Sequence, residues 1–518
     1  MTWVPDRAAE VAHSLPTGAS HFLDRGLGWH DISGAMTTTH SPACAEETLA
    51  SAPVRLTAVQ RKFPCWMARL QAGLTASVRA SGENLGHLEE RILQQTRELS
   101  RGALEEAAQT KADATPPRCG GCGGPLTRCA HGHARTFESR FGPITVRRTR
   151  GWCRRCHRWR FPADAALGLE ETAGYSPSVQ EMAALAVSKL PVAEASAVVE
   201  RLTGVKLPRA TLDREARRQG QRAQAQRAHL DQQMQTPAGS AQQGRELQLA
   251  LPLAPFTLVI ELDAWNIRER DQWGESEARR AAGEEPGRWH WVYGGTCFRL
   301  SQRGQTAGGR PIILSRGSVM TRGGVDALRE QLWAEASRHG LGQAADVLIV
   351  ADGAAWIWNL ATDRFPQARQ RLDAYHAKQH LWAVADALHG AGTPAARAWV
   401  EPLLAKLDHS EGLQVITDLR ALLDTLDQTR RETVQREINY LDSHRDRMDY
   451  AEGKQRGEPI GSGAMESTCR QYQCRFKRPG QFWTQTGDEA LLCLDTFWRN
   501  GRWDQLYPHV GKFDPSKN

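Results

Sequence analysis

The sequence lacks the long apolar segments that membrane and secreted proteins carry. Its longest apolar stretch, residues 250–260, is broken by Pro252 and Pro255. It falls short of the roughly 20 residues that a membrane-spanning helix needs. Residues 1–30 contain acids and bases but no apolar block, so no secretory signal is expected. These absences predict a cytoplasmic protein without a membrane partner.

Cysteine is also scarce, with 11 residues in a chain of 518, which excludes a disulfide scaffold. No GxxxxGK[ST] loop is present, so the sequence implies no energy source from nucleotide hydrolysis. The net charge of +7 is a moderate basic excess and is by itself weak evidence for a nucleic-acid partner. The clustering of arginine is the stronger signal.

The length is enough for about three or four domains. Residues 1–54 are rich in Ser, Thr, Gly, Pro and Ala and are expected to be poorly ordered, or an extension from an upstream start site. The next segment has leucines at three- and four-residue spacing, which predicts an amphipathic helix that packs on the main body or mediates self-association. The expected order of segments is a helical arm (55–115), a zinc ribbon (116–165), a helix-turn-helix-like region (170–228), a polar linker (229–254), an α/β core (255–393 and 459–505) and a helical insertion (394–458).

Two CxxC pairs lie in the predicted ribbon, Cys119 with Cys122 and Cys153 with Cys156. Glycines surround the first pair, and a predicted β-hairpin separates it from the second. Four thiolates presented in this way suit a tetrahedral Zn²⁺ site in a reducing compartment. Further potential ligands are nearby, but both pairs are complete without them: Cys129, His131, His133 and His157.

Arginine clusters in two segments. The ribbon carries Arg135, Arg140, Arg147, Arg148, Arg150, Arg154, Arg155, Arg158 and Arg160, interleaved with Trp152, Trp159 and Phe161. The second cluster lies on a predicted helix from Thr211, after a turn at Thr203 and Gly204, and resembles a recognition helix. Either cluster could be only a solvated face. We interpret both as contacts to DNA phosphates and expect these residues to bind DNA: Arg147, Arg148, Arg150, Arg214, Arg217 and Arg218.

Acidic residues follow two apolar segments of the predicted core. Residues 255–270 predict a strand that ends at Asp263, with Glu261 two residues earlier on the same face. The β-branched run 347–350 predicts a buried strand, and Asp352 follows it. Asp263 could instead be a turn residue, Glu261 a competing ligand, and Asp352 a cap for the next helix.

The elements between and after these strands complete the core. Residues 289–300 and 310–317 predict two further strands, which we expect to be antiparallel, and residues 325–340 predict a helix. A short strand running into a helix contains Asp373 and His376. Glycines then open a helix that carries Glu466 in its first turns. Glu466 could be an ordinary surface acid paired with Arg470 four residues on.

Three segments resemble DDE transposases of bacterial insertion sequences, closest to the ISKra-type family. They are VLIVADGAAWIWNLA, LDAYHAKQHLW and the stretch from GSGAMESTCRQYQCRFKRPG to RNGRWDQLY. The ribbon motifs RCGGCGGPL and WCRRCHRW also match that family, and the similarity covers about residues 80 to 508. The resemblance implies an α/β, RNase H-like mixed-sheet core with an all-helical insertion.

The resemblance also implies the site. The catalytic triad and the ligands of Mg²⁺ (or Mn²⁺) would be Asp263, Asp352 and Glu466. Two divalent ions roughly 4 Å apart serve phosphodiester chemistry, and hard cations need carboxylate oxygens. Asp373 and His376 resemble the Asp-x-x-His pair of Mutator-like relatives and, with Glu261, would support catalysis or brace the fold. Arg470, Lys477 and Arg478 follow Glu466 and would contact DNA.

The implied function is metal-dependent cleavage and strand transfer of DNA. The partners would be double-stranded element ends and target DNA, which requires a homodimer or higher oligomer and places the protein on the nucleoid when bound. One alternative is a non-catalytic zinc-ribbon DNA-binding protein, derived from a domesticated or decayed element. Another is a nuclease on the same core.

Overall fold

The centre of the protein is a five-stranded mixed sheet with the strand order β10-β9-β4-β5-β8. The computed structural model describes residues 56–169, 174–246, 254–269, 275–283, 289–479, 481 and 483–510. The prediction for residues 1–54 lies outside these residues. The sheet strands are β4 (Thr257–Arg268), β5 (Trp289–Arg299), β8 (Gly317–Thr321), β9 (Asp346–Ala351) and β10 (Arg369–Leu372). The predicted α/β class with a mixed sheet is therefore confirmed.

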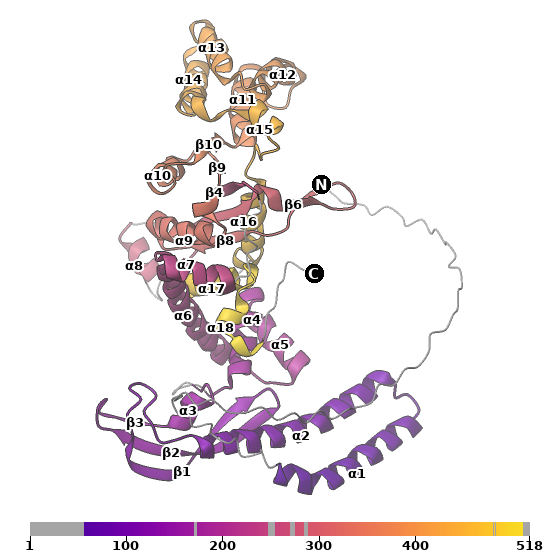
Figure 1. Ribbon diagram of the computed structural model, residues 1–518. Coiled ribbons are helices and arrows are strands. Elements are labelled where there is room, and N and C mark those ends of the chain that lie inside the picture. The colour runs from indigo at the N-terminus through magenta and orange to yellow at the C-terminus, as the bar shows by residue number, and fades with distance from the viewer. Residues whose placement is uncertain are drawn as a thin grey trace, which may run out of the picture. The chain divides into compact units, whose positions relative to one another are not determined.

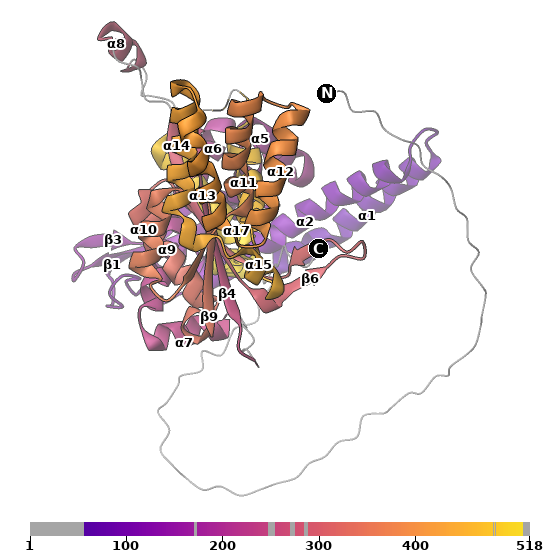
Figure 2. The same ribbon diagram turned by 90° about the horizontal axis from the view of Figure 1, so that it is seen from above.

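The strand directions divide the sheet into two parts. β4 pairs antiparallel with β5, and β5 pairs antiparallel with β8. On its other side β4 pairs parallel with β9 (Figure 2). β9 in turn pairs parallel with β10. Parallel neighbours need a crossover connection. The chain returns from β4 to β9 through β5, β8 and the helix α9 (Gly324–Arg338), and it passes from β9 to β10 through the helix α10 (Ala355–Arg364). The predicted buried strand at 347–350 and helix at 325–340 are confirmed.

Two strand predictions are wrong. Residues 310–317 do not form the third strand of the sheet. β7 (Pro311–Ile313) makes a separate short hairpin with β6 (Arg303–Gln305), and β8 takes the sheet position. Asp263 does not end its strand either, since β4 continues to Arg268 by pairing with β5.

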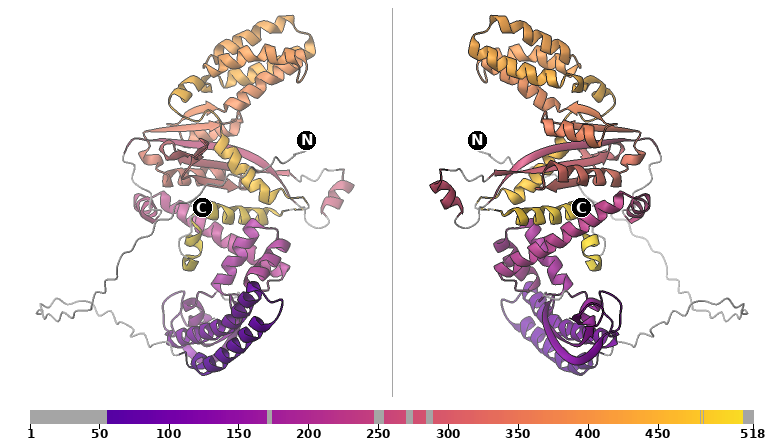
Figure 3. Two further views of the ribbon diagram at one scale, coloured as in Figure 1. Left: turned by 90° about the vertical axis from the view of Figure 1, so that its right-hand side faces the viewer. Right: turned by 90° about the vertical axis from the view of Figure 1, so that its left-hand side faces the viewer.

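Both faces of the sheet are covered by helices. One face shares a hydrophobic core with α9, α10 and a helical bundle built from residues after β10. The other packs on α16 (Gly463–Phe476) and α17 (Gln485–Arg499), the yellow helices against the sheet in Figure 3. The bundle (Figure 1, orange) contains α11 (Ala374–His389), α12 (Pro394–Asp408), α13 (Gly412–Leu422), α14 (Gln428–Ser443) and α15 (Tyr450–Gln455). The all-helical character predicted for 394–458 is confirmed.

The segment before the sheet is more helical than predicted. α4 (Pro177–Lys189) starts at Ser176, whose side chain accepts the Val179 N–H, and α5 (Val192–Thr203) ends at Gly204 in the left-handed conformation. α6 (Arg209–Met234) and α7 (Pro237–Glu246) follow. The predicted linker over 229–254 is therefore wrong as far as residue 246. Its glutamines support helices instead: Gln243 donates to the Leu230 carbonyl and accepts from Arg338 on α9.

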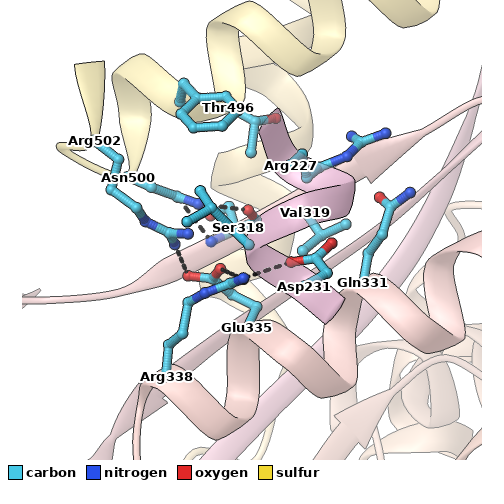
Figure 4. Close-up of a pocket in the computed structure, with 12 residues that line it drawn as sticks. Arg227, Asp231, Ser318, Val319, Gln331, Glu335, Arg338, Thr496, Asn500 and Arg502 are labelled. Atoms are coloured by element: carbon cyan, nitrogen blue, oxygen red, sulfur yellow. Dashed lines mark hydrogen bonds and ion pairs between the residues drawn. The ribbon is translucent and has the colours of Figure 1, made fainter. Parts of the chain in front are cut away.

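A buried ionic cluster joins these helices to the C-terminal segment (Figure 4). Glu335 on α9 is paired with both Arg338 and Arg502. Arg338 also pairs with Asp231 on α6, with 2.6 Å between Nη2 and Oδ1. Charges this deeply buried must be paired, so the cluster fixes how α6, α9 and the residues after α17 meet.

The N-terminal described part is a helical hairpin followed by a small sheet. The hairpin consists of α1 (Thr57–Arg79) and α2 (Leu85–Ala114), of which the sequence predicts the second helix alone. The sheet has three antiparallel strands, β1 (Thr127–Ser139), β2 (Gly142–Cys153) and β3 (Arg158–Arg160), with the short α3 (Pro162–Ala166) after them. Of the helices that the structure describes, none has both the length and the apolar character needed to cross a bilayer.

Candidate metal centre

Three aspartates follow the last paired positions of the three parallel strands. β4 and β9 end their pairing at Leu262 opposite Ala351, and β9 and β10 end theirs at Ala351 opposite Leu372. Asp263, Asp352 and Asp373 are the next residues on each strand, and the Asp373 N–H donates to the Ala351 carbonyl at 2.8 Å. The parallel register alone therefore aligns these aspartates at one edge of the sheet.

Two buried carboxylates hold the beginning of α16 against this edge. Glu261, 1% exposed, accepts the Met465 N–H at 2.8 Å through Oε2. Asp373, also 1% exposed, accepts the backbone N–H and the hydroxyl of Ser462. The first N–H groups of a helix have no partner within the helix, so acids placed here satisfy them and favour the helix dipole. Glu261 and Asp373 thus determine where α16 starts.

The position of α16 brings Glu466 to Asp373. Ligand atoms of Asp373, His376 and Glu466 all lie within 4.8 Å of one another. His376 comes from the first turn of α11, which Asp373 caps by accepting the N–H groups of Tyr375 and His376. Two carboxylates and one imidazole at this separation can hold a divalent cation such as Mg²⁺ or Mn²⁺. Asp373 and His376, predicted only as support, are therefore the immediate neighbours of Glu466.

Asp263 and Asp352 lie beside this cluster, although they form no comparably tight group of three among the described residues. Burial raises the pKa of Asp263, and the charge of Asp352 raises it further, while a hydrogen bond from Cys469 and the proximity of His376 lower it. A cation near both acids would relieve this repulsion. Asp352 also accepts the Ala354 N–H at 2.9 Å, but Ala354 is itself the N-cap of α10 and no side chain caps this helix, so the alternative that Asp352 caps it is wrong.

The sequence does not predict that Tyr440 and Cys469 lie next to the site. Gly353 lies against Tyr440 of α14, so closely that a Cβ at position 353 would come within 2.5 Å of the phenol ring. Cys469 on α16 shares a hydrogen bond with the Asp263 carboxyl, and burial raises the pKa of its thiol. Tyr440 reaches the site only because the helical bundle folds back over the sheet edge.

The bundle adds a second histidine on the helix that carries His376. His380 lies one turn further along α11, and its Nδ1 is 2.5 Å from Oε2 of Glu437 on α14. Its ring stacks on Tyr440 with 3.5 Å between centroids. The spacing of His376 and His380 by four residues was the one available signal that both lie on one helix face.

The four predicted zinc ligands come together in the ribbon. The Sγ atoms of Cys119, Cys122, Cys153 and Cys156 lie within 4.8 Å of one another. The separations are 3.8 Å for Cys119–Cys156 and 3.5 Å for Cys122–Cys153. A tetrahedron with Zn–S bonds of about 2.3 Å has edges of about 3.8 Å, so the group fits structural zinc. The extra candidates Cys129, His131, His133 and His157 are not in the cluster.

The predicted DNA-binding arginines have different environments. Arg148 is buried, pairs with Asp164 at 2.5 Å, and lies over the Phe161 ring, so it stabilises the ribbon and presents little surface. Arg147 and Arg214 are exposed. Four other arginines and Lys477 already have acidic or aromatic partners: Arg150 with Trp159, Arg217 with Asp213, Arg218 with Glu215, Arg478 with Glu194 and Lys477 with Trp265. Arg470 is 80% exposed and lies 3.6 Å from Glu466.

A family described as "Uncharacterised protein family (UPF0236)" matches residues 333–505, the range that holds Asp352, Asp373, His376 and Glu466. The chain is similar to a protein of Streptococcus gallolyticus named "UPF0236 protein in vanSb 3'region". The two are 25% identical over 369 residues, which cover 67% of this chain and 68% of that protein.

Proposed function

We propose that the protein is a DDE-type DNA transposase whose core is RNase H-like. The observation that carries the proposal is the order and direction of the five strands, together with the position of the acids on them. Asp263 lies within β4, directly after the last residue that pairs with β9, Asp352 follows β9, and Glu466 lies on a helix that packs on β4. These positions support the proposal, which takes the roles of the three acids from the resemblance to insertion-sequence transposases.

The carboxylate oxygens and the imidazole nitrogen of the site suit hard divalent cations such as Mg²⁺ or Mn²⁺. Asp263, Asp352 and Glu466 would hold them, with Asp373 and His376 beside Glu466. When bound, such ions activate the attacking oxygen and neutralise charge on the phosphate that is attacked. Hydrolysis at the element end breaks a phosphodiester P–O bond and frees a 3′-hydroxyl. In strand transfer, that hydroxyl attacks a target phosphate, forms a new P–O bond and displaces a 3′-oxygen.

The residues around the acids would position DNA for these steps. Arg470 lies one turn beyond Glu466, and Lys477 ends the same helix, so cations follow the acid along α16. Exposed arginines of the ribbon and of α6 would bind the element ends through their phosphates, among them Arg147 and Arg214. The ribbon itself would need its zinc ion to keep this surface folded.

Transposition joins two DNA ends, so at least two copies of the chain are expected on DNA. The helical hairpin offers a surface for this contact, because several of its large apolar side chains are exposed. They are Phe63 (45%), Met67 (43%), Val78 (74%), Leu85 (70%), Ile92 (41%) and Leu93 (48%). Large exposed apolar surfaces often mark contacts between proteins, so the hairpin is the surface that we propose for this contact.

The test uses the full chain, Mg²⁺ or Mn²⁺, and a labelled duplex ending in the element's terminal repeat. We expect 3′-end nicking and joined products, both lost in Asp352→Asn and Glu466→Gln while duplex binding is retained. Gln471→Ala, a neighbouring exposed position on α16, is the matched control and should remain active. Binding without nicking would favour a non-catalytic DNA-binding protein. Cleaved ends without joined products would favour a nuclease.

A further inference from the structure

The helical bundle brings one tyrosine to the metal centre. Tyr440 on α14 contacts Gly353, the residue that directly follows Asp352. A Cβ at position 353 would lie 2.4 Å from the Tyr440 hydroxyl oxygen, so the hydroxyl itself, and not only the ring, lies against the backbone beside Asp352. Glycine at position 353 leaves the space that the phenol fills.

The acids of the centre lie near this hydroxyl. Burial raises the pKa of Tyr440, and the charge of Asp352 raises it further, while a hydrogen bond with the Gly353 backbone lowers it. The charge of Asp373 also raises this pKa. Both carboxylates are therefore close to the hydroxyl, yet the hydrogen bonds of Asp352 and Asp373 go to backbone N–H groups and to Ser462. At neutral pH the phenol keeps its proton and can donate it in a hydrogen bond.

The ring of Tyr440 is held on two sides. His380 stacks on it with 3.5 Å between ring centroids, and His444 meets it edge-on with 4.8 Å between centroids. His380 is itself fixed, because its Nδ1 lies 2.5 Å from Oε2 of Glu437, whose side chain is buried. Turning the phenol away from Asp352 would break this stack, so the hydroxyl keeps its place at the centre.

Comparison with Tyr450, in the same bundle, distinguishes this hydroxyl from one that is only part of the core. Tyr450 is fully buried, and its hydroxyl has no hydrogen-bond partner among the described residues, so no ligand reaches it. Tyr440 is only half-buried, and its hydroxyl oxygen is not among the buried unpaired atoms of the described side chains. The Tyr440 hydroxyl is therefore open to a ligand at the edge of the sheet.

A ligand of this hydroxyl must offer an acceptor beside carboxylates. A phosphodiester does so when divalent cations offset the acids, because its non-bridging oxygens are anionic acceptors and tyrosine is one of the side chains that bond to DNA phosphates. We propose that the Tyr440 hydroxyl donates a hydrogen bond to a non-bridging oxygen of the phosphodiester at the metal centre. This inference deepens the proposed function and rests on it for the identity of the ligand. Tyr440 keeps its proton, and its bond strengthens as charge develops on the phosphate oxygens.

The contact can be measured as binding, without cleavage. The probe is the dinucleotide TpT, a single phosphodiester, added to the full chain with Mn²⁺, which broadens the phosphorus NMR signal of a bound phosphate. Tyr440→Phe keeps the ring that stacks on His380 and removes only the hydroxyl. We expect it to weaken TpT binding about tenfold, because a hydrogen bond to a charged group is lost. The affinity for Mn²⁺ and the thermal unfolding midpoint should stay at wild-type values. Tyr450→Phe, the same change at the buried position, is the control and should bind TpT like the wild type.

The contact would be overturned if the wild type did not bind TpT or if Tyr440→Phe bound it equally well. An equal loss in Tyr450→Phe, or a loss of Mn²⁺ affinity that accounts for the weaker binding, would overturn it too. Nicking of element ends separates this inference from the proposed function, and we expect Tyr440→Phe to slow it about a hundredfold with little change in duplex affinity. If the wild type binds TpT through Tyr440 but never nicks an element end, the function fails and the contact stands. If both proteins nick equally, the function stands and the contact fails.

Discussion

Ser462 donates two hydrogen bonds to one oxygen of Asp373, from its backbone N–H at 2.6 Å and from its hydroxyl at 2.7 Å. The other carboxylate oxygen of Asp373 accepts from the N–H groups of Tyr375 and His376. One buried carboxylate therefore caps α11 and also fixes the start of α16, 89 residues later in the chain. Since His376 and Glu466 lie on these two helices, Asp373 sets the geometry of the cluster as well as belonging to it.

Asp373→Asn should cost about 3 kcal/mol of stability, because an amide group would face buried donors that need an acceptor. Ser462→Ala removes one of the four bonds and should cost about 1 kcal/mol. The midpoint of denaturant unfolding measures both. Equal effects of the two substitutions would show that Asp373 does not connect the helices as described.

The parts of the fold that followed local pattern were predictable. The run at 347–350 is apolar, with three β-branched residues and Leu348; all four are buried, and they form the middle of β9. β8 was missed because Gly317–Thr321 has little apolar content, and its burial comes from contacts with α9 and α17 that are distant in sequence. The linker prediction failed for a related reason: a glutamine-rich segment looks solvated until Gln243 is seen bonded between α6 and α9.

The candidate site was predictable residue by residue but not as a geometry. Asp352, Asp373, His376 and Glu466 could each be named from the acids, glycines and family resemblance around them. Which of them are nearest neighbours depends on the register of β10 against β9 and on the hydrogen bonds that position α16. Neither is encoded in local spacing. The contact between Tyr440 and Gly353 depends on how the helical bundle, which follows Gly353 in the sequence, folds against the sheet. No local sequence pattern predicts this contact.

The ribbon should contain about one zinc ion per chain, held by four thiolates. Cys122→Ser should lose the metal and unfold the ribbon, because the site supplies much of the folding free energy of so small a sheet. Cys129→Ser is the matched control, since Cys129 is exposed and its thiol lies 3.8 Å from the Leu126 carbonyl, outside the cluster. Elemental analysis of the purified proteins is the measurement. Zinc retained in Cys122→Ser, or lost in Cys129→Ser, would contradict the assignment.

Gly353→Ala should displace either Tyr440 or the chain that carries Asp352. The new Cβ would lie 2.3 Å from a ring carbon of Tyr440, and such overpacking costs about 1–3 kcal/mol. Tyr440→Leu should recover part of that loss in the double variant. Gly463→Ala is the control, because a Cβ there meets no atom within 4 Å and alanine favours the helix. Thermal unfolding and DNA nicking would be measured together. If Gly353→Ala had the unfolding temperature and the nicking activity of the wild type, Tyr440 would not be in close contact with the chain at the site.

Glu335 connects stability to pH through the ionic cluster of Figure 4. Burial alone would raise the pKa of Glu335, but the charges of Arg502, Arg338 and His339 lower it below its ordinary value. Removing this charge in Glu335→Gln leaves Arg338 and Arg502 buried without it, which should cost about 3–5 kcal/mol at pH 7. Glu330→Gln, on the same helix but 53% exposed in its pair with Arg364, should cost at most about 1 kcal/mol.

The difference between wild type and Glu335→Gln should depend on pH with a definite sign. A carboxyl whose pKa is lower in the folded state contributes stability above its unfolded pKa of about 4.3. That contribution is lost as the pH falls toward the lower folded value, because the wild-type carboxyl then becomes protonated and neutral like the amide. The difference in unfolding midpoint between the wild type and Glu335→Gln should therefore be constant from pH 6 to 8 and become smaller below about pH 4. A gap that widens on acidification would show that Glu335 is not held ionised by its arginine partners.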